Sequence, residues 1–131
     1  MGMFKYYDIG HAEVFVFDDF LIKQVKEGVV VNLEETDALR KVLEDNFKNK
    51  NVAYISNRVT SYSVNPLVYK EISKFSNLAA IAIIPNNALM KSNAEYEKQF
   101  FDKPFGVFDS LDKAIRWVHK ILENKNSKVS A

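Results

Sequence analysis

Several features that would reveal a function directly are missing from this sequence of 131 residues. It has no cysteine, which excludes disulfide bonds, a thiolate nucleophile and zinc sites built on thiolates. Its four glycines are scattered, so the sequence has neither a Gly-rich phosphate loop nor a Gly-x-Ser-x-Gly nucleophile elbow. With 18 basic and 17 acidic residues the formal net charge is +1, and this balance does not favour nucleic acid as a partner.

Histidine is equally scarce, since His11 and His119 are the only two and lie far apart in the sequence. A metal site needs two or three ligands at short spacing, so we expect no metal and no cofactor. We expect His11 to be exposed in a turn, and His119 to be half-buried beside the apolar stripe of the last helix.

Long apolar segments are absent as well. The longest run, Leu78 to Pro85, is too short to span a bilayer, and the start of the chain lacks the apolar core of a signal peptide. We therefore expect a cytoplasmic protein without stable membrane insertion. Hydrophobic residues make up 47% and charged residues 27%, as in ordinary soluble domains. The expected organisation is one domain over residues 3–124, a disordered polar tail at 125–131, and residues 1–2 left by an expression vector.

The first third of the sequence predicts an antiparallel meander. Three aromatic and β-branched runs, Phe4–Ile9, Ala12–Phe17 and Phe20–Val25, are separated by the two-residue breaks Gly10-His11 and Asp18-Asp19. Glycine readily takes the positive φ of a tight hairpin turn, so neighbouring runs are expected to pair.

From Asn32 onward the pattern alternates between helices and strands. Asn32 and Glu35 have the spacing of a capping box, which starts the first helix. The elements that follow are the strand Val52–Ser56, the helix Pro66–Phe75, the strand Leu78–Ile84, a helix within Asn86–Phe101, the strand Phe105–Phe108 and the helix Ser110–Glu123. This order predicts an α/β fold with a mixed sheet, in which parallel βα units follow the meander and helices pack on the sheet.

The most informative segment is the polar loop that follows the strand Val52–Ser56. It contains one arginine among amides and hydroxyls, and its candidate partner- or anion-binding residues are Asn57, Arg58, Thr60, Ser61 and Ser63. The start of the following helix would favour an anion there, and Arg58 could pair with a phosphorylated Ser61 or Ser63. The alternative is that these side chains only satisfy turns and helix caps.

A second candidate is aromatic. Tyr96, Phe100, Phe101 and Phe105 cluster around the end of the third helix. Core packing is the ordinary role of such residues, and an apolar pocket or a dimer patch is the alternative.

Four segments carry a resemblance to a known family: Val52–Arg58, Ser61–Ser63, Glu97–Phe101 and Ser110–Trp117. They resemble the STAS fold of the anti-sigma-factor antagonists and, more closely, the SpoIIAA-like (STAS/SEC14-like) family of small uncharacterised bacterial proteins. The resemblance implies a sheet flanked by helices and a switch loop between a central strand and the next helix. This chain departs from the antagonists because it lacks their Asp-Ser-Ser/Thr-Gly motif, and Ser61 and Ser63 are the nearest candidates by position.

The resemblance and the loop together favour a non-enzymatic regulatory or protein-interaction module that binds a protein partner. One alternative is a small-molecule or lipid-binding domain with an aromatic-lined pocket, implied by the SEC14-like relationship; a homodimer is also compatible. An enzyme that uses Arg58 and Ser61 on a phosphorylated substrate is a third hypothesis, but no general base can be assigned to it from the sequence.

Overall fold

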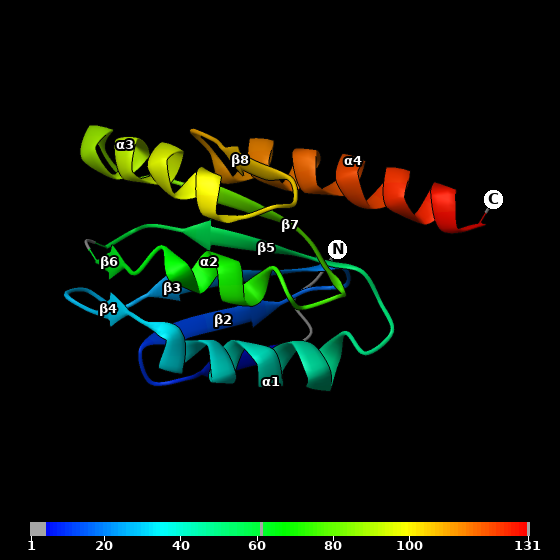
Figure 1. Ribbon diagram of the computed structural model, residues 1–131, viewed down its shortest axis with the longest axis horizontal. Helices are drawn as coiled ribbons and strands as arrows, with labels where there is room; N and C mark the ends of the chain where they lie inside the picture. The colour runs from blue at the N-terminus through cyan, green and yellow to red at the C-terminus, as the bar shows by residue number, and fades with distance from the viewer. Residues whose placement is uncertain (1–4, 61, 131) are drawn as a thin grey trace.

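The central element of the protein is a six-stranded sheet with the strand order β1-β2-β3-β5-β7-β8. The computed structural model describes residues 5–60 and 62–130, and only the backbone of 126–130 (Figure 1). The antiparallel part consists of β1 (Lys5–Asp8), β2 (Ala12–Val16) and β3 (Phe20–Val25). Gly10, with φ of +92°, makes the first turn, so the predicted meander is confirmed.

The parallel part begins at β3, which pairs with β5 (Val52–Asn57). Next to β5 lies β7 (Leu78–Ile84), and β8 (Phe105–Val107) closes this edge of the sheet. Every residue of β7 is buried, as expected for a strand without polar alternation that is covered on both faces. The predicted mixed α/β sheet is therefore confirmed.

Helices cover both faces of this sheet. One face packs against α1 (Thr36–Asn46), α2 (Leu67–Ile72) and α3 (Ala88–Glu97), and Figure 1 shows α1 and α2 lying across the front. The other face packs against α4 (Leu111–Ser130). Successive strand residues point to opposite faces, so Tyr54 faces α1 and α2 whereas Ile55 faces α4.

The structure also corrects several predicted boundaries. A second, two-stranded parallel sheet joins β4 (Val30–Val31) to β6 (Ser63–Val64), in segments predicted only as an extended lead and a loop. Short 3-10 turns precede α1 at Leu33–Glu35 (η1) and follow α3 at Lys98–Phe100 (η2).

The last helix is longer than predicted. It continues to Ser130, so residues 125–130 of the predicted disordered tail are helical, and residue 131 lies outside the described part. The apolar stripe ends at Leu122, but no glycine or proline follows it to stop the helix. Within the described residues, none of the helices combines the length and apolar character needed to cross a membrane.

Candidate functional site

The loop after β5 lies at the carboxyl ends of the parallel strands, where loops of open α/β sheets often form binding sites. Its arginine is directed inward. Arg58 is only 4% exposed, and its Nη2 donates to Glu97 Oε1 at 2.6 Å and to the Tyr69 hydroxyl at 3.0 Å. The guanidinium also lies over the ring of Tyr62, with Cζ 5.4 Å from the ring centre. Arg58 thus joins the loop to α2 and α3 from inside the protein, and its guanidinium is not presented at the surface.

Glu97 completes this buried cluster. It is 5% exposed, and Tyr69 donates its hydroxyl hydrogen to Oε1 at 2.5 Å. Burial raises the pKa of Tyr69 well above its usual value, so the hydroxyl remains a donor. A buried carboxylate and a buried guanidinium that share hydrogen bonds compensate each other's charge. We interpret the Arg58–Glu97–Tyr69 cluster as a structural tether.

The remaining loop candidates lie in different environments. Thr60 Oγ1 donates to the carbonyl of Val25 at 2.5 Å, which ties the loop to the end of β3. Asn57 is half-buried at the end of β5, and Ser63 is exposed in β6 with its amide bonded to the Val29 carbonyl. Ser61 lies outside the described residues.

The predicted aromatic group is divided between the core and the surface. Phe101 and Phe105 are each 6% exposed and belong to the core on the α1 and α2 side of the sheet. Tyr96 is 57% exposed and packs edge-to-face on the half-buried Phe100. Two of these four residues therefore take the ordinary core role, and the other two lie toward the outside of α3 and η2.

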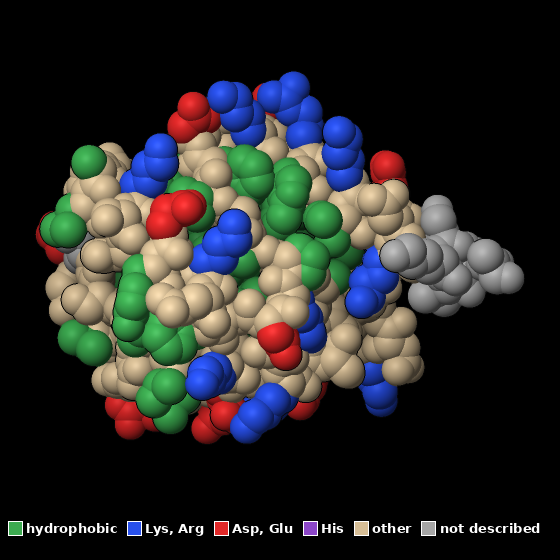
Figure 2. All heavy atoms as spheres, turned by 45° about the horizontal axis from the view of Figure 1, so that its top comes forward, with side chains coloured by type: hydrophobic (Ala, Val, Ile, Leu, Met, Phe, Trp, Pro, Cys, Tyr) green, Lys and Arg blue, Asp and Glu red, His purple; other side chains and the backbone are tan. Residues whose placement is uncertain are grey.

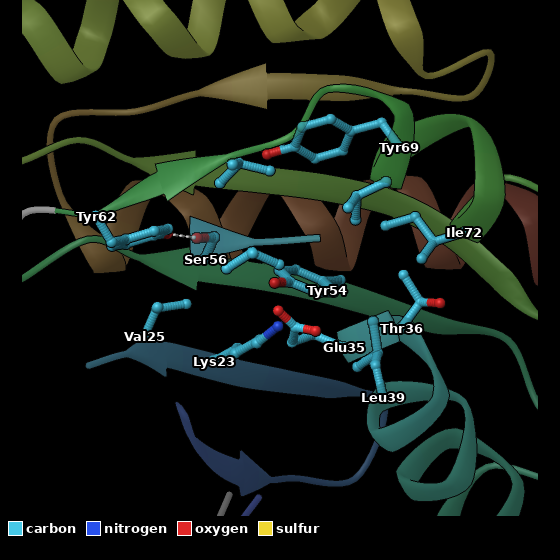
Figure 3. A pocket seen from close by; sticks show the side chains of 13 residues that line it. Lys23, Val25, Glu35, Thr36, Leu39, Tyr54, Ser56, Tyr62, Tyr69 and Ile72 are labelled. Atoms are coloured by element: carbon cyan, nitrogen blue, oxygen red, sulfur yellow. Dashed lines mark hydrogen bonds between the residues drawn. The ribbon is translucent and has the colours of Figure 1, made fainter. Parts of the chain in front are cut away.

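A small cavity that the sequence did not predict lies at the carboxyl ends of β3 and β5, between the sheet and helices α1 and α2 (Figure 3). Its volume of about 20 Å³ is enough for one or two water molecules. Most of the wall is apolar. The residues lining it are Lys23, Val25, Val31, Glu35, Thr36, Leu39, Tyr54, Ser56, Tyr62, Val64, Val68, Tyr69 and Ile72.

Lys23 is the principal charged group of the cavity. It is 4% exposed and lies opposite Ser56 in the pairing of β3 with β5. Among the described residues it has no hydrogen-bond or ion-pair partner, although the carboxylate of Glu35 is near enough to act on it electrostatically. Burial lowers the pKa of Lys23 to about 8, and Glu35 only partly opposes this effect.

Two further groups belong to the same cavity. Glu35 is held by the predicted capping box, since its Oε1 accepts the amide hydrogen of Asn32 at 3.2 Å. The Tyr54 hydroxyl is buried and has no hydrogen-bond partner within the described chain, and burial raises its pKa. Figure 3 shows Lys23, Glu35 and Tyr54 pointing into the middle of the cavity.

His11 lies close to this cluster. Its Nε2 is buried without a partner among the described residues, so the predicted exposed position is wrong. Desolvation, followed by the charge of Lys23, lowers the pKa of His11 to about 4. His119 is half-buried as predicted, with its Nε2 3.4 Å from Asp19.

The sequence contained an indication that Lys23 could be buried. In the strand Phe20–Val25 the inward positions alternate, and Lys23 has the same phase as Leu21 and Val25, which are both core residues. A lysine in phase with core positions indicates either a break in the strand or a buried amine. The partners Glu35 and Tyr54 could not be identified in this way, because they come from elements remote in the sequence.

Exposed apolar side chains gather at the same end of the molecule. Seven large apolar residues of the described chain are exposed, and five of them follow the carboxyl ends of β3, β5 and β7. We call this surface the strand-end face; it consists of Val30, Leu33, Val59, Leu67 and Leu89. Figure 2 shows apolar side chains at this end, on the left of the view.

The comparisons with known proteins concern the fold. The sequence matches no protein-family profile and no curated protein. Its structure is similar to that of an uncharacterised protein from Shewanella loihica, of the DUF3478 family with a SpoIIAA-like fold. The TM-score is 0.54 at 14% identity, over 81% of this chain and 90% of the other. The protein therefore has a SpoIIAA-like fold.

Proposed function

We propose that this protein is a non-enzymatic interaction module that binds a partner protein through the strand-end face. The observation that carries the proposal is the concentration of exposed apolar side chains after three neighbouring parallel strands. Large apolar residues exposed singly are common, whereas a group of them on one face is typical of interaction surfaces. The SpoIIAA-like fold supports it, because the resemblance described above implies a switch loop at the same place.

The character of the loop favours an apolar partner surface over an anionic one. Arg58 is buried and paired with Glu97, whereas its neighbour Val59 is 53% exposed. The described part of the loop thus offers the aliphatic side chain of Val59 to a partner and keeps its positive charge inside. We expect the partner to contribute apolar side chains rather than a phosphate or carboxylate.

Phosphorylation of Ser63 would regulate this surface. Ser63 is exposed and lies directly opposite Val30 of the strand-end face in the pairing of β4 with β6. A phosphoryl group would add about −1.5 to −2 charges at pH 7 next to an apolar contact and would weaken it. Intact-mass measurement of protein from its native cells tests this idea, and absence of phosphate under every growth condition would contradict it.

The main experiment is site-specific photocrosslinking in the native cells. A photoreactive amino acid at Leu67, on the strand-end face, should give a discrete covalent adduct, and Val59→Asp in the same chain should abolish it. The matched control position is Tyr96, which is similarly exposed but lies near the other end of α3. The mass of the adduct distinguishes another protein from a second copy of this chain.

Two outcomes would contradict the proposal. Equal adducts from both positions would indicate unspecific contact, and an adduct from Leu67 that Val59→Asp leaves unchanged would place the partner elsewhere. Because Val59 is a surface residue, Val59→Asp should change the free energy of unfolding by only about 0.5 kcal/mol. Loss of the adduct can therefore be separated from loss of the fold.

A further inference from the structure

The side chain of Lys23 is 4% exposed, and it borders the small cavity without a hydrogen bond or ion pair to any described residue. A charged group removed from water is costly unless it is paired and hydrogen-bonded. Arg58 meets most of that requirement through Glu97 and Tyr69, although its Nε has no hydrogen-bond partner among the described residues. Lys23 has no such contacts within the described chain. Its amine borders the cavity, so this small space is the place where a second group could meet it.

We propose that Lys23 is a nucleophilic amine that forms a Schiff base with a small aldehyde admitted to this cavity. Amines become nucleophiles when desolvation favours their neutral form, and the mostly aliphatic walls of this cavity act on Lys23 in that direction. The pairing of a desolvated lysine with a carboxylate and a phenol hydroxyl supplies the acid–base groups that imine formation needs.

The reaction balances with the groups at hand. The lone pair of neutral Nζ attacks the carbonyl carbon, and the electron pair of the C=O bond moves to oxygen. The carboxylate of Glu35 carries one proton from nitrogen to that oxygen, which gives a neutral carbinolamine. As the C=N bond then forms, Glu35 carries the remaining N–H proton to the hydroxyl group, which leaves as water. The net change is amine plus aldehyde giving imine plus water. The hydroxyl of Tyr54 lines the same cavity and can donate a hydrogen bond to the developing oxyanion.

The size of the cavity sets the class of reactant. About 20 Å³ holds one or two waters, which corresponds to an aldehyde with at most two non-hydrogen atoms. Formaldehyde meets this limit, whereas acetaldehyde, sugars and aromatic aldehydes exceed it. The aliphatic wall, which includes Val25 and Val68, is compatible with the two hydrogens on its carbonyl carbon.

The lowered pKa of Lys23 is consistent with this placement and allows the expected rate advantage over an ordinary lysine to be calculated. With a pKa of about 8 instead of 10.5, the neutral fraction at pH 7 is about 300-fold that of an ordinary lysine. A less basic amine is intrinsically less nucleophilic, and a Brønsted slope of about 0.5, as for thiolates, reduces the gain to about 20-fold. Restricted access to the cavity lowers it further, so we expect an advantage of about 10-fold.

The test is reductive alkylation of the intact protein at pH 7. Formaldehyde is added with cyanoborohydride, which reduces each imine, and peptide mass spectrometry gives the rate at every lysine. Lys23 should react about 10-fold faster than the exposed Lys48 and Lys120. Glu35→Gln removes a charge that raises the pKa of Lys23, but it also removes the group that carries the protons, and we expect the net rate to fall at Lys23 alone. In urea, where the cavity is lost, the advantage of Lys23 should disappear.

The controls keep each outcome decisive. Circular dichroism shows whether Glu35→Gln is folded, and the comparison with Lys48 in the same molecule corrects for reagent concentration. A Lys23 rate equal to or below that of the exposed lysines in the folded wild-type protein would overturn the proposal. So would an advantage that persists in urea, because it would then come from local sequence and not from the cavity.

Discussion

Replacing Lys23 by methionine should stabilise the protein at pH 7, because methionine keeps an unbranched apolar side chain and removes a buried charge. Burial lowers the pKa of Lys23 from 10.5 to about 8. Each tenfold change in an acid constant corresponds to about 1.4 kcal/mol, so burying the charged form costs about 3 kcal/mol. We expect the free energy of unfolding of Lys23→Met to exceed that of the wild type by about this amount.

The pH dependence gives this prediction a second, independent test. Below pH 8 Lys23 is charged in both the folded and the unfolded state, and the full cost applies. Between pH 8 and 10.5 the unfolded chain binds the proton more tightly than the folded protein, so the wild type gains stability as the pH rises. Methionine cannot titrate, and the difference between variant and wild type should shrink across this range.

Urea unfolding followed by circular dichroism at pH 7 and at about pH 10 measures both effects. The slope of the free energy against urea should be equal for the two proteins, which shows that their unfolded states are comparable. Lys48→Met, at an exposed position, is the matched control and should give a small difference at both pH values. A difference that is the same at pH 7 and pH 10, or a variant less stable than the wild type at pH 7, would refute the reasoning.

Two other substitutions test the groups around the site. In the folded protein His11 is neutral down to about pH 4, whereas in the unfolded chain it takes up a proton below about pH 6.5. Wild-type stability should therefore fall between pH 6.5 and pH 4. In acid-unfolding measurements His11→Gln should lose less stability over this range, and an identical profile would contradict the low pKa of His11. Glu97→Ala should destabilise the protein by about 3–5 kcal/mol in urea unfolding, because it leaves Arg58 charged and unpaired inside the protein. As a control, Glu95→Ala at an exposed neighbouring position should change the free energy of unfolding by only about 0.5 kcal/mol. Similar losses for both variants would contradict the stabilising role of the Arg58–Glu97–Tyr69 cluster.

The elements predictable from the sequence are those that have a local period. The meander strand Ala12–Val16 alternates between buried and half-buried positions, and the strand Leu78–Ile84 has an unbroken apolar run. The small sheet of β4 and β6 has only two residues in each strand, which is too few for any period to be detected. The end of α4 was predicted too early because the apolar stripe stops before the helix does.

The candidate site could not be assembled in this way, because its contacts join residues that are distant in the sequence. Arg58 and Glu97 are brought together by the crossover through α2 and β7, so the polar loop alone gave no indication that its arginine faces inward. The four aromatic residues were divided between core and surface: Tyr96 of α3 is exposed and Phe100 of η2 is half-buried, whereas Phe101 and Phe105 are buried. Both outcomes depend on tertiary packing, which a single sequence does not encode in any short window.

The contrast between the two buried cations explains why they are assigned different roles. Arg58 is surrounded by a carboxylate and two tyrosines, so its charge is compensated where it stands, and removing a partner would mainly destabilise the fold. Lys23 has no such partner among the described residues and costs about 3 kcal/mol, against a total stability that is typically 5–15 kcal/mol. A methionine at the same position would pack as well without that cost. Packing and charge pairing therefore account for Arg58, whereas Lys23, which Glu35 compensates only in part, is the residue for which we propose chemistry at the nitrogen.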